Sequence, residues 1–373
     1  MKKLIAISVV FALVAGVAFA VDLGGTVIGH VNVIEKTGSG DVNGSAGFDR
    51  LRLEGAGEVA DGKFGGWLRL QALGFGYTQH SVVGNYNFDE VRAVLAYGYA
   101  WWKPIDQLKL RIGGNGGDGF WGKEGITGWS FVGPVGDADI ATNTGNIWGG
   151  GFAGDLKFRN AFFGGVGYNS LNIEITPVEM VSINIALPFF THGKIGDIFM
   201  GTVAQVDLNL SFGNFAFTYA GASVIENSEA FGYFSLTAID GLELDFGIGS
   251  AFKNTPLKFG LGVAYTSDSW GIKVRSLLAI PVNGDHPPFG MIFDALPYFV
   301  INENFRAYVN VGIGIEDFSD LTGGAGWHLN PYIEVGEYWG AKFAAGFKVS
   351  SKDMKGGSGA IEIALPIALI VSF

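Results

Sequence analysis

The chain has 373 residues, with 24 Lys and Arg against 35 Asp and Glu, which gives a net charge of −11 at pH 7. This acidic balance argues against nucleic-acid binding, because neutralising phosphates requires clustered Lys and Arg. Hydrophobic residues make up 48% of the chain, and charged residues make up 16%, against about 25% in average soluble proteins. The absence of Cys excludes disulfides and a lipoprotein anchor.

Residues 1–20 have the three parts of a secretory signal peptide. A basic start (MKK) precedes an apolar run over 4–16, and AFA at 18–20 offers a small-x-small cleavage site. A membrane-anchor helix is the alternative, but the apolar run is short for one. We therefore expect export and a mature chain from Val21 onward, with 22 basic against 35 acidic residues and a net charge of −13.

Apolar residues alternate with polar or small ones through most of the remaining chain. The pattern is clear in RLRLEGAGEV (50–59), GLELDFGIG (241–249) and NFRAYVNVGIGI (304–315). A period of two predicts β-strands, whereas a helix would repeat near 3.6 residues. No second apolar stretch of 18 or more residues follows, which excludes helical membrane spans. A bilayer then admits only a closed β-barrel, because backbone groups cannot stay unpaired in hydrocarbon.

Short polar turns alternate with longer polar segments along the chain. The short turns are expected near 61–64, 104–107, 212–214, 239–241, 267–269, 302–304 and 336–339. The longer segments cover 35–47, 78–89, 117–145, 190–200, 282–288, 316–324 and 350–358. This alternation is typical of membrane barrels, with tight periplasmic turns and long external loops. It weakens around 158–180, so the sequence predicts an all-β, antiparallel transmembrane barrel of about 18 strands, within a range of 16–20.

The last segment, IEIALPIALIVSF, carries an apolar stripe up to the final residue. A closing strand with such a stripe and a terminal Phe resembles that of bacterial outer-membrane β-barrel proteins, in which it is read by the outer-membrane assembly machinery. The residues that match this assembly signal are Leu365, Ile367, Leu369, Val371 and Phe373. Pro366 departs from the pattern, since a Pro deletes a ladder hydrogen bond. We expect β-bulges or membrane-distal positions at Pro366 and at Pro188, Pro297 and Pro331.

Basic residues recur at the inward-facing positions of the second to fifth expected strands. The candidate pore-lining residues are Arg50, Arg52, Arg69, Arg92, Lys109 and Arg111. Because neighbouring strands lie about 4.8 Å apart, these residues would form a basic patch on one wall. The ordinary alternative is local charge pairing, for example of Arg52 with Glu54 or of Arg92 with Glu90.

The longest loop follows the fifth expected strand and carries four acidic residues, Asp118, Glu124, Asp137 and Asp139. This layout resembles general diffusion porins, whose third external loop folds into the barrel and faces an arginine-rich wall. The resemblance implies a constriction with a transverse field acting on small polar solutes. Alternatively, loop 117–145 stays outside the barrel as a surface loop.

Aromatic residues cluster near the expected short turns, among them Tyr97, Tyr99, Trp101 and Trp270. We interpret them as parts of an interfacial girdle. The five His residues (30, 80, 192, 286 and 328) show no metal-ligand spacing, and no nucleophile motif accompanies them. The sequence therefore predicts no catalytic residues, no metal and no cofactor.

These features together predict a porin-like channel of a Gram-negative-type outer membrane, through which small hydrophilic solutes and ions pass by diffusion. The expected partners are the lipid bilayer and the assembly machinery, and the resemblance also implies a homotrimer. The acidic balance favours weak cation selectivity. Two alternatives remain open: a surface adhesin or structural barrel, and a barrel transporter for hydrophobic solutes.

Overall fold

The structure is a computed structural model of the whole chain. It describes residues 20–36, 42–73, 92–114, 170–188, 201–221, 228–251, 257–281, 289–315, 318–319, 325–338, 341–351 and 361–372. The expected signal peptide lies outside these residues, apart from Ala20. Within the described ranges, no helix is long and apolar enough to cross a membrane.

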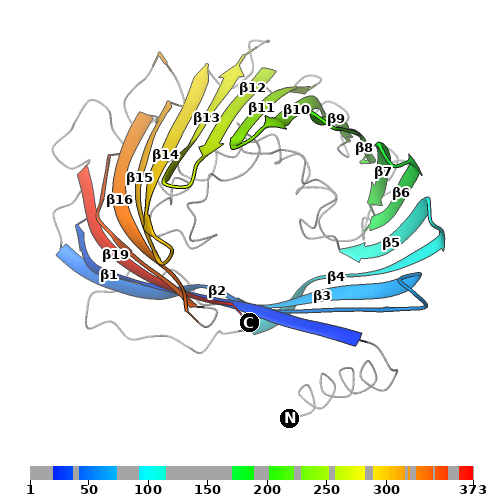
Figure 1. The fold of residues 1–373 in the computed structure, drawn as a ribbon, viewed down its shortest axis with the longest axis horizontal. Helices are drawn as coiled ribbons and strands as arrows, with labels where there is room; N and C mark the ends of the chain where they lie inside the picture. Colours follow the sequence, from blue (N-terminus) through cyan, green and yellow to red (C-terminus); the bar gives the residue numbers. More distant parts are fainter. Residues whose placement is uncertain are drawn as a thin grey trace.

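The described strands form one antiparallel sheet that closes on itself (Figure 1). They are β1 (Ala20–Lys36), β2 (Val42–Val59), β3 (Phe64–Leu73), β4 (Arg92–Ile105), β5 (Leu108–Gly114), β6 (Ser170–Val178), β7 (Val181–Pro188), β8 (Val203–Leu210), β9 (Gly213–Ala220), β10 (Glu229–Ile239), β11 (Leu242–Ala251), β12 (Leu257–Thr266), β13 (Trp270–Ile280), β14 (Gly290–Asn302), β15 (Phe305–Ile315), β16 (Ala325–Tyr338), β17 (Ala341–Gly346), β18 (Lys348–Ser351) and β19 (Ile361–Ser372). From β1 to β17 each strand pairs with the next one in the chain, β17 and β18 both pair with β16 and β19, and β19 pairs with β1 to close the ring.

The described residues form a ring of 18 barrel strands. Of the 19 strand segments, β17 and β18 are two halves of one barrel strand, since both pair with β16 on one side and β19 on the other. When consecutive strands run antiparallel, the first and last strands can also pair antiparallel only if the number of barrel strands is even. The predicted barrel of about 18 strands is therefore confirmed.

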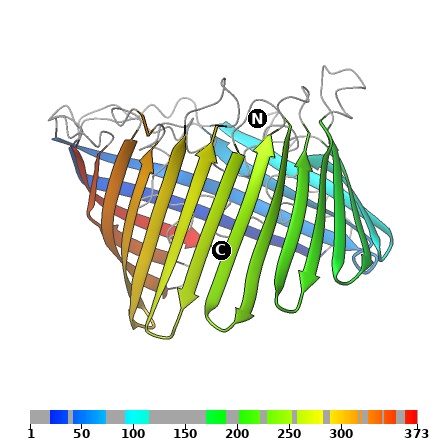
Figure 2. The same cartoon turned by 90° about the horizontal axis from the view of Figure 1, so that it is seen from above.

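Short turns join consecutive strands along one rim of the barrel (Figure 2). The described turns fall at 60–63, 106–107, 179–180, 211–212, 240–241, 267–269 and 303–304. Six of them match the expected positions. The turn at 179–180 lies in the region where the sequence pattern weakened. The expected loop at 35–47 was too long, because β1 continues to Lys36 and β2 begins at Val42.

The two faces of the wall have opposite chemistry. Along β15, Tyr308, Asn310 and Gly312 are buried, whereas Val309 and Ile313 are 37% and 38% exposed. The wall encloses a central space, so the buried, polar face is the inner one and the exposed, apolar face is the outer one (Figure 1). A soluble protein buries its apolar side chains. An apolar outer band round a polar interior is instead the arrangement of a transmembrane barrel.

Pro366 sits where the hydrogen-bonded ladder is interrupted on both sides of the closing strand. On the β1 side, the register shifts between Asn32 and Glu35, one residue beyond the Asn32–Pro366 pair. On the other side, the break between β17 and β18 falls at Phe347, whose amide donates instead to the Pro331 carbonyl at 2.9 Å. The expected bulge at Pro366 is therefore present, since a residue without an N–H fits best where pairing is already lost.

Large apolar and aromatic side chains mark the outer face beside the short turns. Phe64 and Trp102 stack with 6.3 Å between their ring centroids, and Tyr265 lies 5.0 Å from Trp270. Trp102 and Trp270 are 46% and 43% exposed. Aromatic rings with a polar edge are favoured at membrane interfaces. They form the outer rim at the short-turn end of the wall.

Replacing Leu261 with Lys tests which medium covers the outer face. Leu261 lies near the middle of β12 and is 53% exposed. In hydrocarbon, the free energy of unfolding should fall by about 2–4 kcal/mol. In water, the change should stay within about 0.5 kcal/mol. The measurement is urea unfolding in phospholipid vesicles.

The matched control is Ile239→Lys, because Ile239 is 54% exposed and adjoins a short turn. At this interfacial depth the expected loss is about 0–1 kcal/mol. Equally small losses at both positions would show that no hydrocarbon covers the middle of the wall.

Candidate functional site

The inner wall of β2–β6 carries the described part of the predicted basic patch. Arg69 lies on β3, and Lys109 and Arg111 lie on β5, all on the inner face. The backbones of Arg50, Arg52 and Arg92 pair with Ile28, Gln71 and Leu73, respectively, and their side chains lie outside the description. The four acidic residues of loop 117–145, Asp118, Glu124, Asp137 and Asp139, lie outside the described residues.

The basic side chains of this patch are paired with carboxylates from neighbouring strands. Arg69 Nε donates to Glu54 Oε1 at 2.6 Å, and Arg111 Nη2 donates to Glu174 Oε2 at 2.8 Å. Glu54 lies directly opposite Arg69 in the β2–β3 register, which accounts for this pair. The alternative pairing of Glu54 with Arg52 stays untested, because the Arg52 side chain lies outside the description. The charges of Arg69 and Arg111 are thus each offset by a carboxylate on a neighbouring strand.

Three aromatic rings lie under these cations. Arg69 lies over Trp67 at 5.0 Å, Lys109 over Trp101 at 5.0 Å and Arg111 over Tyr99 at 5.5 Å. These cation–π contacts fix the positions of charges that would otherwise swing on flexible stems. Tyr99 and Trp101 therefore face inward, and their interpretation as parts of the interfacial girdle was wrong. Trp102, one residue on, takes that outer position.

Gly65 makes room for one of these rings, the indole of Trp101. It pairs with Trp101 across the β3–β4 ladder, and a Cβ at this position would overlap the Trp101 indole. The indole therefore packs against the bare backbone of β3, with Lys109 on the ring. The position of Lys109 on β5 thus depends on the absence of a side chain on β3, two strands away.

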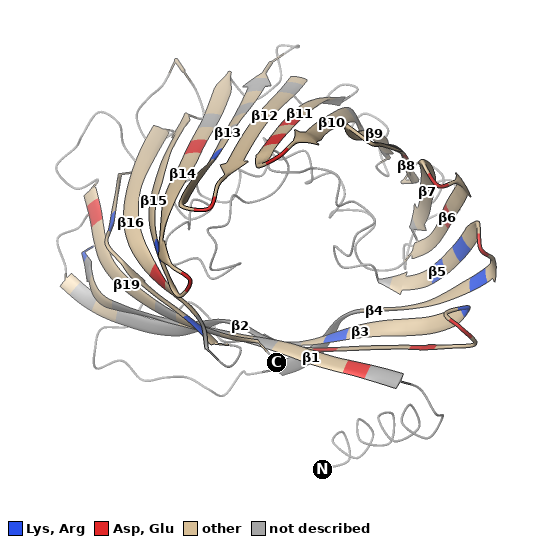
Figure 3. Ribbon diagram, in the orientation of Figure 1, with Lys and Arg blue, Asp and Glu red and all other residues tan. Residues whose placement is uncertain are grey.

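The next sector of the inner wall is acidic. No Lys or Arg occurs among the described residues of β6–β11, whereas Glu174, Asp207, Glu243 and Asp245 lie on its inner face. The contrast with the blue segments of β3 and β5 is visible in Figure 3. Sequence reasoning missed this sector, although the lack of basic residues between 170 and 188 and between 201 and 251 was a readable signal.

Two of these carboxylates are held by hydrogen bonds within the wall. The Gln205 amide donates to both oxygens of Asp207 at 2.9 and 3.0 Å, and Asn184 donates to it at 3.4 Å. The Tyr233 hydroxyl donates to Asp245 Oδ1 at 2.6 Å. Hydrogen bonds to an ionised oxygen are about twice as strong as neutral ones, so they orient the carboxylates firmly.

A third sector, on β13–β17, combines stacked tyrosines with both signs of charge. The ring centroids of Tyr298 and Tyr308 are 5.4 Å apart, and those of Tyr308 and Tyr332 are 4.8 Å apart with an interplanar angle of 10°. A Cβ at Gly271 or at Gly346 would overlap Tyr298 or Tyr332, respectively. The charged residues of this sector whose side chains the structure describes include Lys273, Asp294, Arg306, Glu334 and Lys342.

His328 is part of this inner wall. Its Nε2 contacts the side-chain oxygen of Asn310, and its ring and the Asp294 carboxylate meet over Gly312, where a Cβ would overlap both. Among the described residues, no group of three or more Asp, Glu or His side chains is arranged to hold a metal ion. The geometry suits a polar lining rather than a catalytic centre.

The closing strand presents its predicted stripe to the outside. Leu369 is 49% exposed on the outer face of β19, opposite Phe343, which is 42% exposed. Leu365, Ile367 and Val371 occupy alternate positions on the same strand and are half-buried. Phe373 lies outside the described residues. The role of these residues in assembly stays a prediction.

Solved structures of similar fold cover nearly the whole chain. One, described as "Asymmetric conductivity of engineered proteins", is 14% identical and has a TM-score of 0.51, with 95% of this chain and 100% of that chain covered. A triple mutant of the Rhodopseudomonas blastica porin is 13% identical, with a TM-score of 0.49 and the same coverage. An anion-selective porin from Comamonas acidovorans is 12% identical, again with a TM-score of 0.49 and the same coverage.

At these identities the likeness concerns the fold. It supports the closed antiparallel barrel that the strand pairing shows. No protein-family model and no curated protein sequence matches the chain. The function of the inner wall is therefore argued from its own residues.

Gly65→Ala tests whether this glycine positions the aromatic and cationic layer. The added methyl group would displace Trp101, and we expect a loss of about 1–3 kcal/mol in unfolding free energy, as for an overpacked core. A change in the near-ultraviolet circular dichroism of the tryptophans should accompany it.

The control is Gly66→Ala, one residue along β3 on the outer face. There the nearest atom to a new Cβ is the Tyr99 carbonyl oxygen at 3.4 Å, so little has to move. Equal stability of the two variants would show that Trp101 does not depend on Gly65.

Proposed function

We propose that this protein is an outer-membrane channel through which small hydrophilic solutes and ions diffuse passively. The observation that carries the proposal is the reversal of faces in a closed wall. Polar side chains point to the enclosed space, and large apolar side chains point outward. Such a wall is stable in hydrocarbon, because every described barrel strand has two hydrogen-bonded neighbours and no strand edge has a row of unpaired N–H and C=O groups.

The size and the lining of the wall favour diffusion of polar solutes. Barrels of 16–18 strands are wide enough to leave an aqueous channel. The inner face offers paired charges, amides and hydroxyls, which exchange hydrogen bonds with hydrated solutes. A transporter of hydrophobic solutes would need an apolar inner surface instead. Diffusion through such a lining requires no catalytic step.

Selectivity in this proposal is weakly cationic. Arg69 and Arg111 are paired with Glu54 and Glu174, whereas β6–β11 contribute the further carboxylates Asp207, Glu243 and Asp245 with no described Lys or Arg. Rings of fixed charge select ions by local potential. Arg50, Arg52 and Arg92 as pore-lining groups, and the acidic residues of loop 117–145 as a constriction, belong to the same proposal.

Location and assembly are proposed on the sequence features. The MKK start, the apolar run and the AFA site support export, with residues 1–20 removed and residues 21–373 forming the barrel. The stripe ending at Phe373 supports recognition by the outer-membrane assembly machinery. A trimer rests on the resemblance to porins alone.

Single-channel recording in a planar bilayer tests the channel directly. Purified, refolded protein should give discrete, steady conductance steps in KCl. Deletion of residues 117–145 should raise the conductance if that loop narrows the pore. A folded, inserted barrel that carries no current would overturn the proposal and move attention to adhesion through the loops.

Replacing Glu54 and Glu174 with Gln should shift ion selectivity toward anions. The two substitutions leave Arg69 and Arg111 without their carboxylate partners. A unit charge about 10 Å from an ion in water contributes about 0.4 kcal/mol, with opposite sign for cations and anions. Each substitution should therefore change the cation-to-anion permeability ratio by about fourfold at low salt. The measurement is the reversal potential under a KCl gradient.

The control is the double substitution Asp240→Asn and Asp268→Asn, which removes the same charge from exposed short turns. Its expected effect is smaller, since salt and water screen charges at the rim. A larger shift in the control would place the selective charges outside the inner wall.

A further inference from the structure

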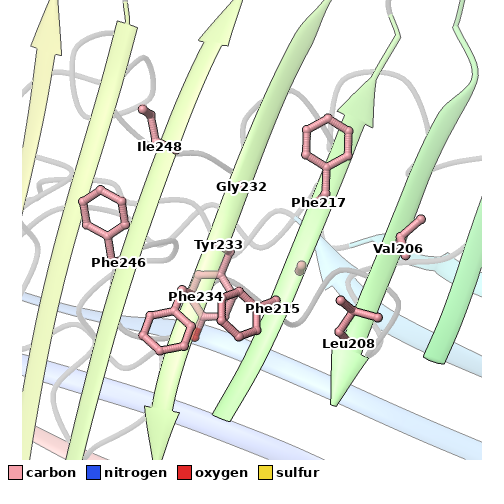
Figure 4. A pocket seen from close by; sticks show the side chains of 10 residues that line it. Val206, Leu208, Phe215, Phe217, Gly232, Tyr233, Phe234, Phe246 and Ile248 are labelled. Atoms are coloured by element: carbon pink, nitrogen blue, oxygen red, sulfur yellow. The ribbon is translucent and has the colours of Figure 1, made fainter. Parts of the chain in front are cut away.

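The outer face of β8–β11 contains a recess of about 340 Å³. Its walls are apolar side chains of the outer face, including Val206, Phe217, Phe246 and Ile248, and its floor is the backbone at Gly232 of β10. Figure 4 shows the rings of Phe217 and Phe246 on either side of this bare stretch. In the ladder, Gly232 pairs with Phe217 on one side and with Ile248 on the other, so the recess lies between two rows of protruding groups.

Packing within the wall does not require glycine at this position. A Cβ at Gly232 would meet only Ile248 Cγ2, at 3.8 Å, which is an ordinary contact. Gly65, Gly271 and Gly312 differ, because a Cβ there would overlap a neighbouring side chain. Glycine inside a strand is destabilising by roughly 0.5–1 kcal/mol relative to Ala. Because Gly232 has no side chain, the recess stays open, although packing within the barrel does not require a glycine there.

The recess lies at the depth of a single leaflet. Phe217 is five residues from Phe212 in the short turn, which is about 17 Å along the strand. At a tilt of about 45°, this corresponds to about 12 Å of depth. The hydrocarbon core is about 30 Å thick, so the recess falls within the half next to the short turns, which in such barrels is the periplasmic half.

We propose that this recess binds one acyl chain of a phospholipid from the periplasmic leaflet. The proposal rests on the membrane location in the proposed function. The recess is continuous with the exposed apolar face on both sides, and its 340 Å³ has room for roughly ten groups of about 30 Å³, the volume of one water molecule in the liquid. A second barrel would meet the convex wall at protruding groups such as Phe217, which is 59% exposed, whereas a flexible chain reaches between them.

Native mass spectrometry of Gly232→Val tests the proposal. The protein is refolded in vesicles of phosphatidylethanolamine and phosphatidylglycerol and released into mild detergent. The wild type should retain one phospholipid more than Gly232→Val, whose side chain fills the recess. Leu261→Ala is the control, because it removes apolar surface one strand beyond the recess and should keep the wild-type lipid number.

A second measurement separates lipid binding from damage to the fold. Valine favours strands, so heat-modification gels in detergent should show Gly232→Val unfolding at a temperature equal to or above that of the wild type. Equal lipid retention by the wild type and Gly232→Val would overturn the proposal. A change of oligomeric mass in Gly232→Val would overturn it as well, since the recess would then hold a second copy.

Failure of the proposed function gives a different result. Gly232 lies on the outer face, so Gly232→Val should conduct like the wild type if the channel proposal holds. Loss of the extra lipid with unchanged conductance supports both proposals. Retention of the lipid difference by a barrel without conductance would refute the channel and keep the lipid site.

Discussion

The pairing of β19 with β1 is the contact on which the rest of the structure depends. An open sheet leaves two edges of unpaired N–H and C=O groups, each of which costs several kcal/mol in hydrocarbon. Closure removes both edges, and because the described ring has 18 barrel strands, the closing pair of β19 and β1 is antiparallel. The ladder defects around Pro366 are confined to the part of the seam beyond Asn32, so the pairs from Thr26 to Asn32 keep the ring closed.

Closure also divides the side chains between two surfaces, because successive residues of every strand face alternately the enclosed space and the surroundings. Charged groups are thereby brought to one surface from strands far apart in the chain. Arg111 and Glu174 are 63 residues apart and form an ion pair of 2.8 Å. The same constraint gathers Trp67, Tyr99 and Trp101 under three cations. The inner wall is therefore a patterned surface, with an aromatic and cationic sector, an acidic sector and a tyrosine-rich sector.

Glycines have two separate roles in this wall. At Gly65 and Gly312 the missing side chain lets a neighbour from the next strand pack across the backbone, so these glycines belong to the inner lining. At Gly232 the added Cβ would fit, and the glycine instead shapes the outer surface. A count of glycines in the sequence does not distinguish these roles, since both appear as a small residue in an alternating strand.

The sequence by itself determined the strands, the short turns and the barrel class, because period-two alternation and turn residues are local properties. It did not determine the Glu54–Arg69 pair, because a turn at 61–64 would place Glu54 opposite Gln71, whereas the turn at 60–63 places it opposite Arg69. Only the tertiary structure decided the inward direction of Tyr99 and Trp101, the pairing of Arg111 with Glu174, and the recess at Gly232. The physical reason is that each depends on which strands become neighbours and on the space between their side chains, and neither quantity is carried by local pattern.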